Sequence, residues 1–176
     1  LFEDPYGKTF KNRKRHSPES VKLAKTIADE STVLLKNENQ LLPLDAKSLK
    51  SIAIIGPNAD QVQFGDYTWS RNNKDGVTPL QGIKNRVNKN TAIHYAKGCS
   101  LTSLDTSGIA EAVEAAKNSE VAVIFGGSAS AALARDYKSS TCGEGFDLND
   151  LNLTGAQSQL IREVYRTGTP VILVLV

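Results

Sequence analysis

The sequence predicts an α/β fold: a three-layer sandwich with a mainly parallel, flavodoxin-like sheet between two layers of helices. Two observations support this prediction. Short runs of Val, Ile and Leu are nearly continuous rather than alternating with polar residues, as in strands that are buried on both faces. Segments with helical periodicity separate these runs, and such alternation is typical of parallel sheets with crossover helices. We expect the strand order 2-1-3-4.

The first regular element is predicted to be a helix over residues 18–37. Ser17 is a favourable N-cap residue, Pro18 suits the first helical position, and Glu19 places an acid in the first turn. Apolar residues then recur at mostly helical spacing. An apolar hook follows, formed by Leu41, Leu42 and Leu44.

The remaining elements alternate along the chain. Strands are expected at 51–56, 91–96, 120–127 and 170–176. Helices are expected at 78–87, 107–119 and 154–168, the first of them with Thr78 as its cap and Pro79 as its first residue. The chain stops inside its last apolar run, which indicates a fragment of a longer protein, truncated at the C-terminus.

Composition and charge exclude some classes of protein. Hydrophobic residues make up 40% of the 176 residues and charged residues 23%, as in ordinary globular proteins. The net charge of +2 gives no electrostatic reason to expect a nucleic-acid partner. No apolar run approaches the roughly 20 residues that a membrane span needs.

Two long connections follow the first and third predicted strands, at 57–77 and 128–153. Connections of this length are more often functional than short ones. In parallel sheets, ligands bind outside the carboxyl ends of the strands. We therefore expect both loops to leave the same edge of the sheet and to form a site there.

Glu144 is the candidate for chemistry in the second loop, because Gly143 and Gly145 flank it. Glycines remove side-chain bulk and permit unusual backbone angles, which suits a carboxylate that must approach a substrate closely. The same pattern also fits an ordinary solvated turn. The residues alone leave both interpretations open.

The first loop contains Asp66, Tyr67 and Trp69 as candidate substrate-binding residues. An aromatic ring in such a loop can stack on the apolar face of a sugar, while polar groups bond its hydroxyls. Alternatively, Trp69 anchors the loop, and Asp66 and Tyr67 fix its turn.

No cofactor and no metal site are predicted. The segment "IIGPNAD" is similar to the start of a phosphate-binding turn, but it has one glycine, and the proline after it lacks an amide donor. A flavodoxin-like nucleotide-binding module remains a rival interpretation. Cys99 and Cys142 lack the spacing of a zinc site. They are expected to be free thiols, although a disulfide between them stays open.

Several segments, taken in order, resemble the α/β-sandwich domain of family 3 glycoside hydrolases, the β-glucosidase and β-xylosidase group. They are "AKTIADESTVLLKNENQLLPL", "SIAIIGPNAD", "FGDYTW", "TPLQGIK", "IHYAKGC", "EVAVIFGG", "CGEGFD", "LNLTGAQSQLI" and "PVILVLV". The resemblance covers nearly the whole chain, and the ordered set is more specific than any single segment.

The resemblance implies a function and a domain organisation. Residues 1–17 would be a linker from an upstream barrel domain, and 18–176 an incomplete sandwich domain. Glu144 would be the general acid/base of a retaining β-glycosidase that removes terminal β-D-glucosyl or β-D-xylosyl residues from oligosaccharides. The nucleophile would be an aspartate of the barrel. A periplasmic or secreted location would follow.

The chain departs from the family pattern at two positions. Leu148 stands where the family usually has an arginine, and Thr154 where it often has a proline. The first departure puts a salt bridge or the local order of the loop in doubt, but it does not remove Glu144. A non-catalytic sugar-binding or structural module with an inert glutamate is a further alternative.

Overall fold

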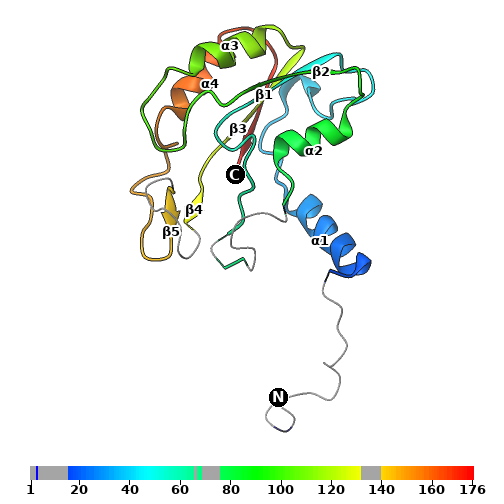
Figure 1. The fold of residues 1–176 in the computed structure, drawn as a ribbon, viewed down its shortest axis with the longest axis vertical. Helices are drawn as coiled ribbons and strands as arrows, with labels where there is room; N and C mark the ends of the chain where they lie inside the picture. Colours follow the sequence, from blue (N-terminus) through cyan, green and yellow to red (C-terminus); the bar gives the residue numbers. More distant parts are fainter. Residues whose placement is uncertain (1–2, 4–15, 66, 69–75, 132–139) are drawn as a thin grey trace. The chain divides into compact units, whose positions relative to one another are not determined.

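The computed structural model describes residues 3, 16–65, 67, 68, 76–131 and 140–176, with residue 131 described for its backbone only. The chain divides into two compact units, Leu1–Leu42 and Pro43–Val176. Figure 1 shows the elements of each unit, which are described separately below.

The first unit contains helix α1, Pro18–Ser31. Its start agrees with the prediction, because Ser17 Oγ accepts a hydrogen bond of 3.2 Å from the Ser20 amide. The predicted end at residue 37 is wrong. The Thr32 hydroxyl bonds back to the Ala28 carbonyl at 3.1 Å, and the Thr32 backbone is extended. A threonine that satisfies a terminal carbonyl in this way competes with continuation of the helix.

A tight turn follows in the same unit. The short 3₁₀ helix η2, Glu38–Gln40, contains Asn39 with φ of 58°. Asn37 closes the turn, since its side-chain amide donates to the Leu42 carbonyl at 2.8 Å and accepts from the Leu42 amide at 3.0 Å. A side-chain amide thus takes the place of a strand partner for Leu42.

The second unit is built on a four-stranded sheet of order β2-β1-β3-β6. Its strands are β1, Ser51–Ile55; β2, Ala92–Ala96; β3, Val121–Gly126; and β6, Val171–Leu175. All three strand pairs are parallel. The structure therefore confirms the predicted α/β class and strand order, with β6 as the fourth predicted strand.

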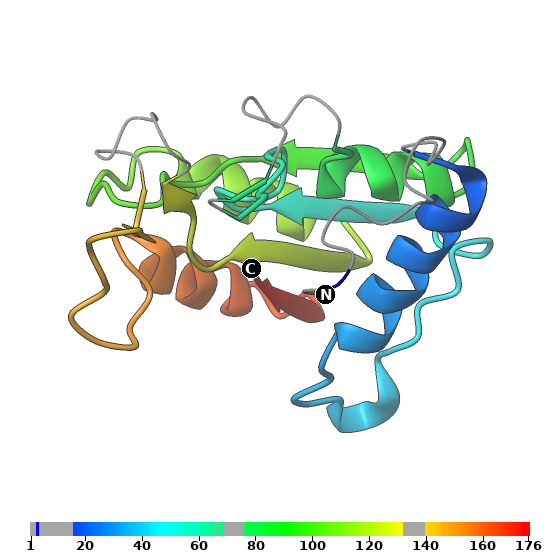
Figure 2. The same cartoon turned by 90° about the horizontal axis from the view of Figure 1, so that it is seen from below.

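Helices lie on both faces of this sheet. They are α2, Pro79–Arg86; α3, Ile109–Lys117; and α4, Gln157–Tyr165. One buried cluster joins α3 and α4 to alternate residues of the strands, including Ala53, Ile55 and Ile124. The other joins α2 to the intervening residues, including Ile54 and Val123. Figure 1 shows the sheet between α2 on one side and α3 and α4 on the other, and Figure 2 shows the strands of the sheet side by side.

Helices α3 and α4 are shorter than predicted. The residues before α3 form a turn instead, in which Asp105 accepts hydrogen bonds from the Ser107 amide and hydroxyl at 2.9 and 3.0 Å. Before α4, the Thr154 hydroxyl bonds the Leu101 carbonyl at 2.6 Å. The bonds of Asp105 are local and common at turns and helix ends, whereas the Thr154 bond reaches a carbonyl 53 positions away in the chain.

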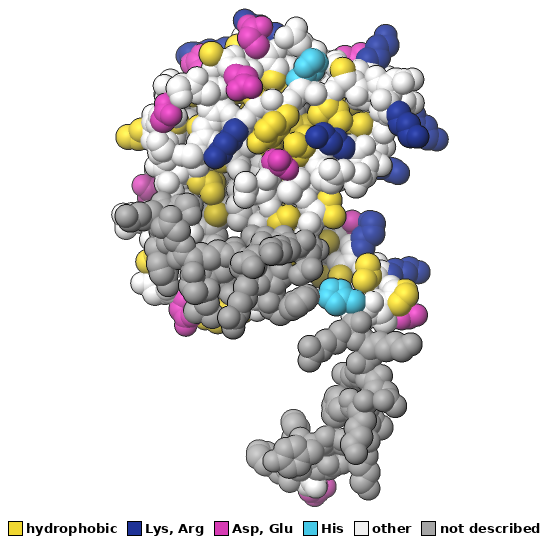
Figure 3. Space-filling model, viewed as in Figure 1, with side chains coloured by type: hydrophobic (Ala, Val, Ile, Leu, Met, Phe, Trp, Pro, Cys, Tyr) yellow, Lys and Arg dark blue, Asp and Glu magenta, His cyan; other side chains and the backbone are white. Residues whose placement is uncertain are grey.

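The outer strands are less buried than the sequence suggests. Strands β1 and β3 are almost wholly buried, whereas β2 and β6 are half-exposed because each has only one neighbour in the sheet of the described residues. Figure 3 shows hydrophobic side chains gathered where β2 lies in Figure 1. The described residues include no helix long and apolar enough to cross a membrane.

Two short strands were not predicted. Strand β4, Ser130–Ala131, pairs in parallel with β5, Cys142–Gly143. Both belong to the long connection after β3, and they bring its start together with its middle part beyond the carboxyl edge of the main sheet.

Candidate active site at the carboxyl edge of the sheet

Glu144 lies at the tip of a tight turn directly after β5. The amide of Gly143 donates to the Phe146 carbonyl at 3.1 Å, and the amide of Phe146 donates to the Gly143 carbonyl at 3.2 Å. Gly145 has φ of +89°, the left-handed value that a type II turn requires at its third position. Gly145, one of the two glycines that flank Glu144 in the sequence, therefore allows the backbone conformation of this turn.

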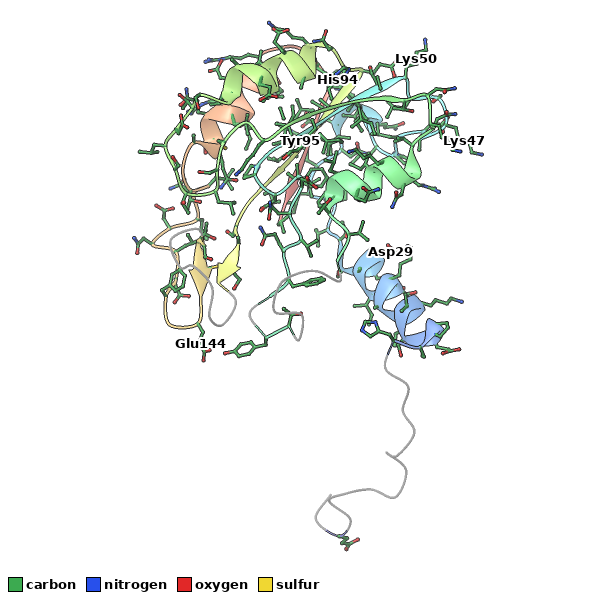
Figure 4. The ribbon with its side chains drawn as sticks, in the orientation of Figure 1. Asp29, Lys47, Lys50, His94, Tyr95 and Glu144 are labelled. Carbon is green, nitrogen blue, oxygen red and sulfur yellow. The ribbon has the colours of Figure 1, made fainter. Side chains whose placement is uncertain are left out.

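The turn displays the carboxylate to solvent. Glu144 is exposed, and Figure 4 shows its side chain pointing away from β5 and from the main sheet. A Cβ added at Gly145 would meet no atom of the described residues within 4 Å.

The base of this loop is closed by hydrogen bonds. Thr141, which is buried, accepts from the Ala129 amide through Oγ1 at 2.9 Å, and its own amide donates to the Ala129 carbonyl at 2.9 Å. The β4–β5 pair continues from this point toward Glu144. Positions 129 and 141 of the loop are therefore tied to each other close to the sheet.

The candidate substrate-binding residues are only partly described. Tyr67 is 76% exposed. The Thr68 amide beside it donates to the Gly65 carbonyl at 3.2 Å, which makes a turn here as the sequence allowed. Asp66 and Trp69 lie outside the described residues.

A polar cleft of about 310 Å³ lies at the carboxyl edge of the sheet. The connections after three strands line this cleft. They contribute residues 57 and 61–63 after β1, residues 97 and 100–102 after β2, and residues 129, 130 and 140 after β3. Lys97 alone carries a charge among these described lining residues. The cleft lies where the strand order reverses between β1 and β3, the usual position of ligand sites in open α/β sheets.

The glycine of "IIGPNAD" has a packing role. Gly56 has φ of +115°, and a side chain there would place Cβ 2.2 Å from the Phe125 carbonyl oxygen. Helix α2 begins only at Pro79, whereas phosphate-binding turns lead directly into a helix N-terminus. Close approach of β1 to β3 therefore accounts for this glycine without a nucleotide.

Neither cysteine is part of a disulfide. Cys99 is buried, and this burial raises the pKa of its thiol, while Cys142 lies half-buried in β5. Within the described ranges, no group of three or more His, Cys, Asp and Glu side chains is arranged to hold a metal ion. His94 pairs with Ala53 in the sheet, and Figure 4 shows it far from Glu144.

Two buried amides, Asn58 and Gln157, flank the start of the loop and were not predicted from the sequence. Both are almost fully buried and hydrogen-bond the backbone just beyond β3. Buried amides are typical of structural hydrogen bonding. Their positions directly after a strand and in the first turn of a helix were the only signals that could have identified them.

Comparison with known proteins gives a consistent result. Residues 32–176 match the model of the glycosyl hydrolase family 3 C-terminal domain. The chain is 40% identical over 156 residues to a β-xylosidase of Formosa agariphila, covering 85% of the chain and 20% of that protein. It is 34% identical over 209 residues to a periplasmic β-glucosidase of Salmonella typhimurium, covering 99% of the chain and 25% of that protein.

Solved structures agree. A β-glucosidase from Listeria innocua, in complex with isofagomine, matches 99% of the chain with a TM-score of 0.75 and 29% identity, over 23% of its own length. The chain thus spans only 20% to 25% of the length of these proteins.

Proposed function

The chain belongs to glycosyl hydrolase family 3, as part of its C-terminal domain, and on this basis we propose that it supplies the general acid/base of a retaining β-glycosidase. Glu144 is the residue that we assign to this role. The observation that carries the proposal is the display of its carboxylate at the tip of a closed turn beyond the carboxyl edge of the sheet.

Retaining hydrolysis needs two carboxyl groups, about 5–5.5 Å apart. One attacks the anomeric carbon, and the other protonates the leaving oxygen and then activates water. The family resemblance assigns the attacking group to an aspartate on a barrel domain outside this chain. An exposed Glu144 on a projecting turn suits a carboxyl that acts across a domain boundary.

The proposed substrates are β-linked glucosides or xylosides. The family members that the chain matches include proteins described as a β-xylosidase and as a periplasmic β-glucosidase. Tyr67, exposed beside the cleft segment 61–63, together with Asp66 and Trp69, would contact sugar hydroxyls and ring faces. No cofactor is required for this chemistry.

The test is Glu144→Gln in the complete glycosidase. Glutamine keeps the size of the side chain but carries no transferable proton. Substrates with poor leaving groups are expected to lose about 10²- to 10⁴-fold in rate, the usual contribution of general acid catalysis. Activated aryl glycosides need little protonation, so their glycosylation step is expected to slow less. Added azide, which needs no base, is expected to restore part of the turnover.

Glu111→Gln is the matched control, since Glu111 is exposed on α3. It makes the same chemical change away from the loop and is expected to leave both rates unaltered. Small and equal losses on both substrate types in Glu144→Gln, without an azide effect, would show that another group is the acid. The loop glutamate would then belong to a non-catalytic module.

A further inference from the structure

The Asn58 side chain holds the outgoing backbone of β3 from the side of β1. It is fully buried, and its Nδ2 donates to the carbonyls of Gly126 and Ser128 at 3.2 and 3.3 Å. Its Oδ1 accepts from Gln63 Nε2 at 2.8 Å, which fixes the orientation of the amide. Both donor hydrogens of Asn58 are thus directed at the start of the loop.

Gln157, at the beginning of α4, holds the residue between those two carbonyls. Its Oε1 accepts from the Gly127 amide at 2.9 Å, and its Nε2 donates to the Gly127 carbonyl at 3.0 Å. Nε2 also lies 3.3 Å from the Leu101 carbonyl. With an exposed fraction of 1%, this side chain is a fixed part of the core.

The two amides hold the backbone of β3 beyond the end of the β1–β3 ladder. Strand β1 stops at Ile55, so the Gly126 and Ser128 carbonyls lie beyond its last residue. On the side of β6, the Val176 amide still donates to the Gly126 carbonyl at 3.0 Å, and the Val176 carbonyl accepts from the Ser128 amide at 2.8 Å. A primary amide has a carbonyl acceptor, as a peptide group has, and two N–H donors where a peptide group has one, so it can bond the buried backbone groups that would otherwise lack partners. Asn58 and Gln157 therefore hold the outgoing chain from the sides that β6 does not cover, and together with the Val176 backbone they set the direction in which it leaves β3.

That direction is transmitted to Glu144 through successive hydrogen bonds. Ala129 follows Ser128 directly and is bonded to Thr141 at both its amide and its carbonyl. Thr141 leads into β5, which ends at Gly143, the first residue of the turn that carries Glu144. The path from the core to the carboxylate is thus continuous.

We propose that Asn58 and Gln157 are positioning residues for Glu144, acting through the backbone at 126–129 and the Ala129–Thr141 closure. This inference rests on the acid/base function proposed for Glu144. A displacement of about 1 Å at a reacting group can lower the rate about 10²-fold. We therefore expect the two amides to affect proton transfer by Glu144 more than substrate binding.

The experiment uses Asn58→Leu and Gln157→Leu in the complete glycosidase. Each change removes the amide while keeping a side chain of similar size. We expect rates on substrates with poor leaving groups to fall roughly 10- to 100-fold, with a smaller loss on activated aryl glycosides and partial rescue by azide. KM is expected to change little, because both side chains are buried and their proposed role is to position Glu144.

A matched pair of threonine variants separates positioning from stability. Thr141→Val removes the acceptor of the Ala129 amide, whereas Thr91→Val removes a hydroxyl that bonds the Leu49 carbonyl at 2.8 Å at the opposite edge of the sheet. Both threonines are buried, at 6% and 8% exposed. Thr141→Val is expected to slow substrates with poor leaving groups more than activated ones, with partial rescue by azide. Thr141→Ser keeps the hydroxyl and is expected to have the rates of the unaltered enzyme. Thr91→Val is expected to show neither the leaving-group dependence nor the azide effect.

The outcomes distinguish the two proposals. If Glu144→Gln shows the leaving-group dependence but the Asn58, Gln157 and Thr141 variants behave as Thr91→Val does, the positioning role is wrong and the acid/base role stands. If Glu144→Gln itself lacks that dependence, the acid/base role is wrong and the positioning role is overturned with it. If the two leucine variants do not fold, the comparison of Thr141→Val with Thr91→Val decides whether the backbone path to Glu144 positions the carboxylate.

Discussion

Gly56 and Gly82 show how differently one residue type can be used in this chain. At Gly56, φ is +115° and an added Cβ would lie 2.2 Å from the Phe125 carbonyl oxygen. At Gly82, inside α2, the nearest atom to an added Cβ is Val77 Cγ1 at 3.9 Å. The first position requires glycine, and the second only tolerates it.

Alanine at these two positions is therefore expected to change stability in opposite directions. Gly56→Ala adds backbone strain and a clash with β3, and we expect it to lower the free energy of unfolding by about 2–5 kcal/mol. Gly82→Ala removes a flexible residue from a helix and is expected to raise it by about 0.5–1 kcal/mol. Urea unfolding of both variants measures this, and changes of the same sign would contradict the packing described at Gly56.

The N-terminus of α2 depends on a single side chain. Thr78 Oγ1 accepts from the Gln81 amide at 3.2 Å and donates to Asp60 Oδ1 at 2.8 Å. It therefore both caps the helix and attaches it to the connection that follows β1. We expect Thr78→Ala to lower the free energy of unfolding by about 1–2 kcal/mol, measured by urea unfolding. Thr78→Ser keeps the hydroxyl, and an equal loss in that variant would show that the bonds contribute little.

The strands were predictable from the sequence because their apolar runs are bounded by polar residues and glycine, and the predicted limits lie within about one or two residues of the observed ones. The starts of α1 and α2 were also predictable, because Ser17 and Thr78 are recognisable caps. The end of α1 and the ends of α3 and α4 were not. Thr32 and Asp105 bond to nearby backbone and Thr154 bonds a carbonyl 53 positions away, and the periodicity of apolar residues contains no information on such bonds. The half-exposed state of β6 depends on its place in the sheet, which a local pattern does not encode.

The sequence predicted where the candidate site lies in the fold and one of its residues, Glu144. Loop length, sheet class and the glycines around Glu144 predicted its place beyond the carboxyl edge. The supporting amides did not follow, because their partners are backbone groups 30 to 70 positions away. The proposed sugar contacts Asp66 and Trp69 stay predictions, since both lie outside the described residues.

At the scale of the whole molecule, the proposed chemistry requires more than this chain. The chain covers 20% and 25% of two relatives that are glycosidases. The family resemblance places the nucleophilic aspartate on a barrel domain outside the chain. Because the covalent route depends on that nucleophile, Glu144 by itself lacks the partner for retaining hydrolysis.

We therefore expect the 176-residue chain, purified by itself, to hydrolyse no 4-nitrophenyl β-glucoside or β-xyloside. Release of nitrophenol is measured over hours, with circular dichroism to establish that the chain is folded. The same chain carrying Glu144→Gln controls for contaminating glycosidases, because a contaminant gives equal background in both preparations. Turnover that is present in the unaltered chain and removed by Glu144→Gln would mean that a second carboxyl group within these residues acts with Glu144. The assignment of the nucleophile to another domain would then be wrong.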